Sequence, residues 1–207
     1  MALVKYNNNS ISAITDIADS MKGAMTLIKE ITASSDDTID FVDGTSDVVL
    51  DSTYPIYLFK FINIHPETDG ADFSFQGNAA GGSGYNETIT STFFSASQSE
   101  GGVGGQVSYT TSMDLAQSTS FIPLNNDVGA DNDQQTSGYL YIFNPSSTTF
   151  VKQFMSRSGR VDAGDYVVDC FSAGYFNTTS AIDEIQFKFD SGDIDAGTVK
   201  LYGIKDS

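Results

Sequence analysis

Where two residue types share a chemistry, this chain uses the one that forms strands or turns rather than the one that forms helices. Asp outnumbers Glu by 22 to 5, and Phe outnumbers Leu by 15 to 8. Glu and Leu favour helices, whereas Phe favours strands and Asp favours turns. In a chain of 207 residues with 19 Gly, this bias predicts an all-β fold. We expect a jelly-roll-like antiparallel β-sandwich of about ten short strands.

The N-terminal segment follows a different pattern from the rest of the chain. Apolar residues within residues 11–25 recur at the spacing of one helix face, and Ser10 is placed to cap such a helix. The same pattern also permits an extended arm. We therefore expect an arm or short helix over residues 1–23 and a single β-sandwich domain over residues 24–207. The arm is expected to pack on the flank of the domain, to reach a neighbouring subunit, or to stay disordered.

Residues 55–64 are predicted to form a strand that is apolar on both faces. Four aliphatic side chains would project to one side: Ile56, Leu58, Ile62 and Ile64. Three aromatic side chains would project to the other: Tyr57, Phe59 and Phe61. A strand of this kind is covered on both faces, and the second cover could be another sheet, a loop or another subunit. Together with the arm it gives a candidate subunit interface, formed by Ile11, Ile14, Met21, Tyr57, Phe59 and Phe61.

The charge of the chain argues against two classes of partner. Ten Lys and Arg against 27 Asp and Glu give a formal net charge of -17. Such a chain would repel nucleic acid and an anionic membrane surface. Residues 61–151 contain no Lys or Arg at all, so part of the surface must be purely negative. No stretch reaches the roughly 20 apolar residues of a membrane span, and no signal peptide precedes the domain, so we expect a soluble, unexported protein.

The residues that usually carry catalysis or bind metals are scarce. The single histidine, His65, and the single cysteine, Cys170, cannot form a zinc site of several His or Cys ligands. His65 is expected in a turn or packing role, and Cys170 in the core or an interface. Carboxylates such as Glu67 and Glu87 could form a glycosidase pair, but every acidic β protein offers such pairs. We therefore expect no enzyme activity and no cofactor.

Clusters of Asp and Gly allow two further interpretations. Six Asp between residues 36 and 51, together with Asp131 and Asp133, could bind calcium, although solvated turns explain them as well. The glycines of residues 101–105 match no phosphate-binding motif. Flexible loop tips are the expected structure there, and no metal site is predicted.

The C-terminal region carries a motif with a physical explanation. Residues 182–189 alternate, with Ile185, Phe187 and Phe189 on the predicted inner face. The chain then continues as Ser-Gly-x-Ile-x-x-Gly, and a final strand ends in Leu-Tyr-Gly-Ile. Gly192 and Gly197 are expected to supply positive φ or close backbone approach. The final strand is expected to pair with residues 182–189.

This motif resembles the ending of virion structural proteins from tailed phages that infect marine bacteria. It is carried by Ser191, Gly192, Ile194, Gly197, Leu201, Tyr202, Gly203 and Ile204. Residues 49–54, 61–66 and 143–150 resemble the same group. The resemblance implies a capsid decoration or cement protein, most simply a homotrimer that also contacts another virion protein such as the major capsid protein. It would be made and assembled in the host bacterial cytoplasm and end in the virion. The alternatives are a tail fibre or spike that binds host-surface glycans, and a glycan-degrading enzyme.

Overall fold

The computed structural model describes residues 23–205 and is an antiparallel β-sandwich, which confirms the predicted all-β class. Its strands are β1 (Met25–Asp36), β2 (Ile39–Val42), β3 (Ile56–Pro66), β4 (Phe73–Ala79), β5 (Ile89–Ser99), β6 (Gln106–Tyr109), β7 (Ile122–Pro123), β8 (Thr136–Phe143), β9 (Lys152–Val161), β10 (Tyr166–Phe176), β11 (Ile182–Phe189) and β12 (Ile194–Ile204). Within residues 23–205, no helix has the length and hydropathy needed to cross a membrane. The predicted arm, with Ile11, Ile14 and Met21, lies outside the described residues.

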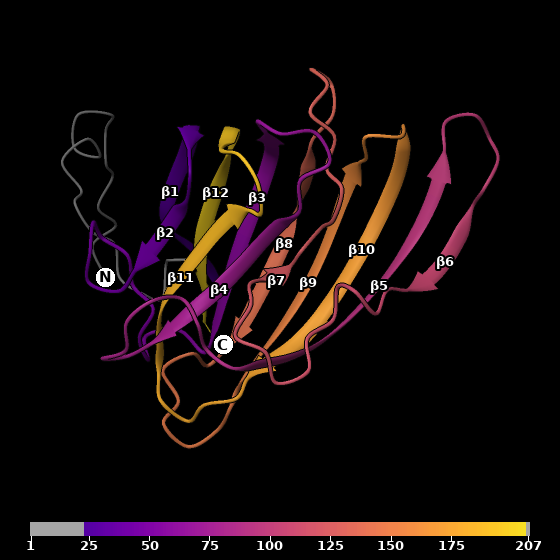
Figure 1. Cartoon of the computed structure of the whole chain (residues 1–207). Helices are drawn as coiled ribbons and strands as arrows, with labels where there is room; N and C mark the ends of the chain where they lie inside the picture. Colours follow the sequence, from indigo (N-terminus) through magenta and orange to yellow (C-terminus); the bar gives the residue numbers. More distant parts are fainter. Residues whose placement is uncertain (1–22, 206–207) are drawn as a thin grey trace, which may run out of the picture.

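The two sheets differ in size. The larger has eight strands in the order β1-β12-β3-β8-β9-β10-β5-β6, and the smaller has four in the order β2-β11-β4-β7. The smaller sheet lies across one part of the larger one, and β10, β5 and β6 extend beyond it (Figure 1). The larger sheet therefore has a partly covered inner face, and its outer face is turned away from the smaller sheet.

The core between the sheets is built largely from phenylalanine rings. The Phe59 ring of β3 lies 5.2 Å from Phe41 of β2 and 5.3 Å from Phe187 of β11, measured between ring centroids. Further along, Phe75 of β4 meets Phe154 of β9 edge to face at 5.2 Å. Each such side chain contributes about 1.5 to 3 kcal/mol by leaving water. These contacts explain why the chain uses Phe where many proteins use Leu.

The aromatic side of β3 faces this core, which corrects part of the predicted interface. Tyr57 and Phe59 are 0 % exposed and Phe61 is 1 % exposed. The smaller sheet covers Phe59 and Phe61, and the β2–β3 connection covers Tyr57 through Tyr54, so within one chain all three are already buried and cannot meet another subunit. The prediction that they form a subunit interface is wrong, because the outer side of β3 is the one that carries Lys60, together with Ile56 and Ile62.

The C-terminal motif has the expected backbone, but its strand has different neighbours. Gly192 and Gly197 have φ angles of 68° and 124°, and a Cβ at Gly197 would come within 2.6 Å of the Asn63 carbonyl oxygen. Ile194 is fully buried, as expected. However, β12 pairs with β1 and β3 rather than with β11. The connection after β11 carries the chain from the smaller sheet into the larger one, so the predicted pairing is wrong.

Candidate functional site

The outer face of the larger sheet carries most of the exposed apolar side chains of the described chain. Residues paired across antiparallel strands project to the same face, so the strand register defines this surface. It exposes nine of the twelve large hydrophobic side chains that are exposed within residues 23–205: Met25, Leu27, Ile62, Phe94, Val107, Tyr109, Tyr139, Met155 and Val167. We call this surface the outer face. The other three, Val103, Phe150 and Val151, lie in connections.

Aromatic side chains organise the centre of the outer face. Tyr139, Tyr141 and Phe143 follow one another along β8, with centroid separations of 5.4 Å and 6.2 Å. With Met155 and Phe171 they line a shallow hollow of about 430 Å³. An array of neighbouring rings has few ways to rearrange, so the outer face presents a preformed apolar surface.

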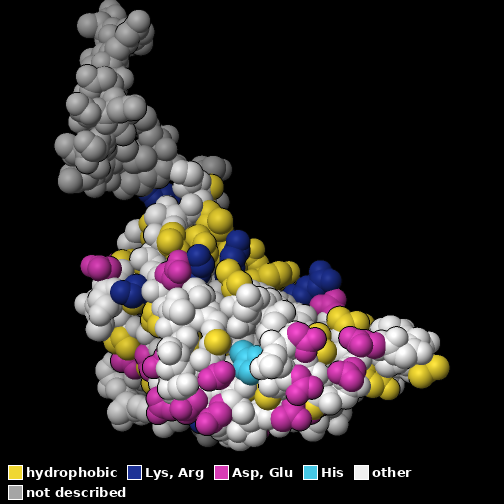
Figure 2. Space-filling model, turned by 90° about the horizontal axis from the view of Figure 1, so that it is seen from above, with side chains coloured by type: hydrophobic (Ala, Val, Ile, Leu, Met, Phe, Trp, Pro, Cys, Tyr) yellow, Lys and Arg dark blue, Asp and Glu magenta, His cyan; other side chains and the backbone are white. Residues whose placement is uncertain are grey.

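The outer face also differs in charge from the rest of the molecule. It carries three cations, Lys60, Arg157 and Lys200, against two acids, Glu30 and Asp169. Arg157 pairs with Asp169 at 2.8 Å and Lys200 with Glu30 at 2.9 Å. Seen from above, most visible acidic side chains gather around the histidine in the lower part of the view, whereas basic and hydrophobic ones lie along its upper side (Figure 2). This face is therefore locally near neutral in a strongly acidic protein.

The sequence contains a signal for the outer face that composition alone does not reveal. Tyr139, Tyr141 and Phe143 are spaced at every second residue, while Leu140 and Ile142 between them are fully buried. The strand that contains them, β8, is apolar on both sides, as β3 is. Because β3 and β8 are adjacent in the larger sheet, their apolar outer sides lie next to each other. Together they indicate an extended apolar surface rather than one exposed residue.

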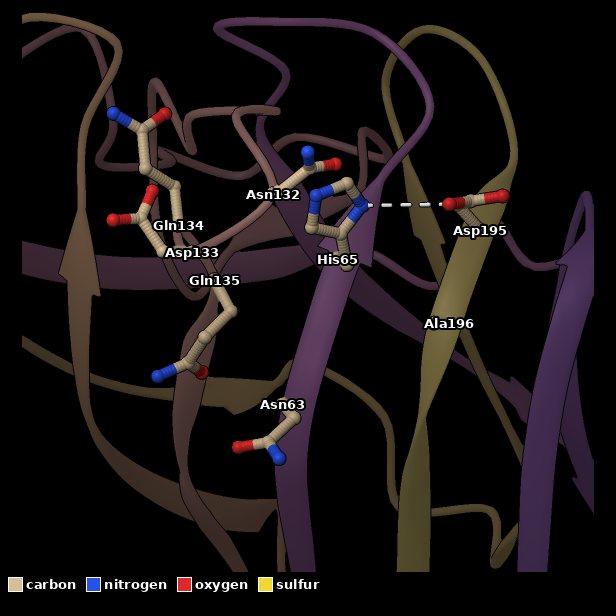
Figure 3. Close-up of a pocket in the computed structure, with 8 residues that line it drawn as sticks. All are labelled: Asn63, His65, Asn132, Asp133, Gln134, Gln135, Asp195 and Ala196. Atoms are coloured by element: carbon tan, nitrogen blue, oxygen red, sulfur yellow. Dashed lines mark ion pairs between the residues drawn. The ribbon is translucent and has the colours of Figure 1, made fainter.

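A separate polar cleft lies where β3 and β12 meet the loop before β8. The imidazole of His65 lies between Asn132 and Asp195, and Asn63 and Gln135 lie along the same cleft (Figure 3). The His65 Nδ1 is 3.6 Å from an Asp195 carboxylate oxygen, and its Nε2 is 3.3 Å from the Asp131 carbonyl oxygen. The residues lining this cleft of about 460 Å³ include no Ser, Thr or Cys. The His65–Asp195 pair therefore has no nucleophile beside it and ties two strands to a loop.

The other candidate residues show no catalytic or metal-binding arrangement within the described chain. Burial raises the pKa of the Cys170 thiol to about 11, so the thiol is protonated at neutral pH and is a poor nucleophile. Cys170 packs with Phe93 and Val168 in a small second core. Residues 23–205 contain no group of three or more His, Cys, Asp or Glu placed to hold a metal ion. The Asp side chains instead cap turns, as Asp51 does for the Thr53 amide.

Comparisons with known protein families, with curated proteins and with solved structures found no match.

Proposed function

We propose that this chain is a non-enzymatic phage virion structural protein, a capsid decoration or cement protein that acts through protein–protein contacts. The observation that carries the proposal is the outer face, where exposed apolar side chains gather on one side of an acidic protein. Apolar residues scattered singly over a surface are ordinary, but a contiguous patch marks an interaction site. The resemblance of the C-terminal motif to phage virion proteins supports the same role.

The order of the strands also supports this proposal. Setting aside β1, β12 and the β8–β9 hairpin leaves eight of the twelve strands. Numbered along the chain, these eight lie in the orders 1-8-3-6 and 2-7-4-5 in the two sheets. Two interlocked Greek keys give this order, which is the jelly roll found in viral capsid and lectin domains. We propose that the domain is a jelly roll with a hairpin inserted in its larger sheet.

A second copy of this chain is the partner that best fits the outer face. Two molecules that each carry a formal charge of -17 repel one another over most of their surfaces. On the outer face the charges nearly cancel, so copies can approach there with the least repulsion. Burying its apolar side chains between copies would then supply the association free energy. We propose a homotrimer held through this face, which in the virion also contacts another protein such as the major capsid protein.

A pair of charge substitutions tests this role. Met155→Asp places a carboxylate at the centre of the outer face, where Met155 is 56 % exposed, so the fold should be unchanged. Val103→Asp places the same charge in the β5–β6 turn, at a residue that is 71 % exposed. In sedimentation velocity of the full chain, Met155→Asp is expected to leave monomers and Val103→Asp to keep trimers. A Met155→Asp protein that assembles like the unchanged chain would contradict the proposal.

A further inference from the structure

We propose that a second site, on the inner side of the larger sheet, binds a neutral polyhydroxylated ligand of the saccharide class. The site is a cleft of about 530 Å³, within the usual range for small-molecule pockets. It goes beyond the proposed assembly role, since it lies on the opposite side of the sheet from the outer face. Three segments far apart in the sequence form it: the β5–β6 hairpin, the loop after β7 and the turn between β9 and β10.

The cleft exists because the larger sheet extends beyond the smaller one. Past the small core of Phe93, Val168 and Cys170, the inner sides of β5 and β6 have no sheet opposite them. Their inward residues are polar: Ser95 pairs with Ser108 across the hairpin, and Ser97 pairs with Gln106. The loop after β7 closes the other side of the cleft, while its Leu124 and Val128 pack into the main core.

Arg160 holds that loop in place. Its side chain is only 4 % exposed, and its Nη1 donates to the Asp127 carbonyl oxygen at 2.8 Å. Its Nη2 donates to the Asn126 side-chain oxygen at 3.2 Å. Its Nε is buried and has no hydrogen-bond acceptor within the described chain. Arg160 thus fixes the loop against the sheet and makes this side of the cleft a rigid wall.

The opposite wall offers hydrogen-bonding groups that the protein itself does not use. Within residues 23–205, the side-chain hydroxyls of Ser95, Ser97 and Ser108 make no hydrogen bond to another protein group. A hydroxyl both donates and accepts, so this wall matches a ligand that itself carries several hydroxyls. The ring of Tyr166 and the side chain of Val168 also line the cleft. They provide an apolar surface against which the C–H face of a sugar ring can pack.

The local charge argues for a neutral ligand. The lining residues include the Arg160 cation and two acids, Asp127 and Asp162. Asp162 is already occupied, because one of its oxygens accepts from the Gly164 and Tyr166 amides and the other lies 3.4 Å from Arg160. A phosphate or sulfate would meet a net negative site in a strongly acidic protein. A divalent cation would find too few free carboxylates.

The proposal can be tested by titrating the full, isotope-labelled chain with defined probes and following its backbone amide signals. The probes are glucose, galactose, mannose and N-acetylglucosamine, each to about 50 mM, since millimolar dissociation constants are weak but measurable. At least one sugar should shift the amides of residues 95–97 and 126–127 saturably. Inorganic phosphate and calcium at the same concentration should not.

Two variants and a matched control complete the test. Ser97→Leu fills the cleft and is expected to weaken sugar binding at least about tenfold, whereas Ala96→Leu, on the outer side of the same strand, should change it less than about twofold. Gln106→Ala shortens an exposed side chain of the cleft, so the fold should be unchanged, and it should also weaken binding. The proposal is overturned if no sugar shifts these amides, if phosphate or calcium shifts them instead, or if Ser97→Leu and Ala96→Leu have equal effects.

Discussion

Phe94 and Phe171 stack face to face across the pair of strands β5 and β10, with ring centroids 4.7 Å apart and planes inclined by 2°. The Arg157 guanidinium lies 5.0 Å from the centroid of Phe171 and is held there by Asp169 through two hydrogen bonds of 3.0 Å and 2.8 Å. Phe94 nevertheless remains 43 % exposed. The protein thus orders an aromatic stack on its own surface, where a partner can cover it.

Phe93 and Phe94 are adjacent in the sequence, but Phe93 lies in the core and Phe94 lies on the outer face. Phe93 is fully buried, so Phe93→Ala should lower the free energy of unfolding by about 3 to 5 kcal/mol. Phe94→Ala removes only a surface stack and should cost about 0.5 to 1.5 kcal/mol. Urea unfolding of both variants checks the difference. If both variants lost the same free energy of unfolding, Phe93 and Phe94 would not be the buried and the exposed residue of this strand.

Substitution of Tyr57 tests whether this residue belongs to the core or to a subunit interface. Its hydroxyl donates to the Asp51 carbonyl oxygen at 3.0 Å, and burial raises the pKa of its phenol. Tyr57→Phe removes this hydrogen bond and should lower the free energy of unfolding by about 0.5 to 1.5 kcal/mol. The molecular mass in solution should not change. If the variant dissociated into monomers at unchanged stability, Tyr57 would belong to an interface after all.

Asp72 should make the stability of the protein depend on pH. Burial raises the pKa of its carboxyl group above the ordinary value of 3.8, and the nearby Asp190 raises it further. A group with a raised folded-state pKa binds its proton more tightly in the folded protein, so its ionisation costs stability as the pH rises above 3.8. Asp72→Asn removes this cost and its side-chain oxygen can still accept from the Asp127 amide, as Asp72 does at 2.8 Å.

The expected result is a higher unfolding temperature for Asp72→Asn at neutral pH and no difference below pH 3.8. Asp133→Asn changes the net charge equally at an exposed position and serves as the control, with little effect at either pH. Thermal unfolding followed by circular dichroism checks both. A variant that is less stable than the unchanged protein at neutral pH would contradict this account of Asp72.

Two glycines of neighbouring strands should respond oppositely to substitution. A Cβ at Gly174 would lie 2.4 Å from the Thr90 carbonyl oxygen and 2.6 Å from the Phe154 ring, so Gly174→Ala should cost about 1 to 3 kcal/mol. A Cβ at Gly159 would meet nothing within 4 Å. Gly159→Ala should therefore be neutral or stabilise the strand by about 0.5 to 1 kcal/mol. Chemical denaturation of the two variants measures both changes and so tests whether Gly174 is tightly packed and Gly159 is not.

The sequence predicts the fold class and one strand face well because those features are local. In residues 182–189, polar residues separate Ile185, Phe187 and Phe189, and all three are buried as expected. The sidedness of β3 was harder to predict, because apolar residues occupy both of its faces and Lys60 alone marks the outer one. The pairing of β12 also depends on where the chain crosses from one sheet to the other, and no hydrophobic periodicity in the sequence indicates that crossing.

The candidate sites were less predictable than the fold. The predicted interface rests on the pattern of single segments, whereas the exposed apolar side chains of the outer face come from seven strands that only the sheet order brings together. The saccharide cleft likewise joins Ser97, Asn126 and Arg160, which are distant in sequence. In the sequence, these three polar residues cannot be distinguished from ordinary surface residues. Only the register of the hairpin and the hydrogen bonds of Arg160 place them around one space.

The mass of the full chain in solution tests the central claim most directly, namely that the outer face joins copies of the protein. Light scattering should be measured on the eluted protein over a range of about 1 to 100 μM, which brackets the micromolar association expected of a functional interface. The account predicts a particle of three chains, each of 22.2 kDa. A mass of 22.2 kDa at every concentration would contradict it.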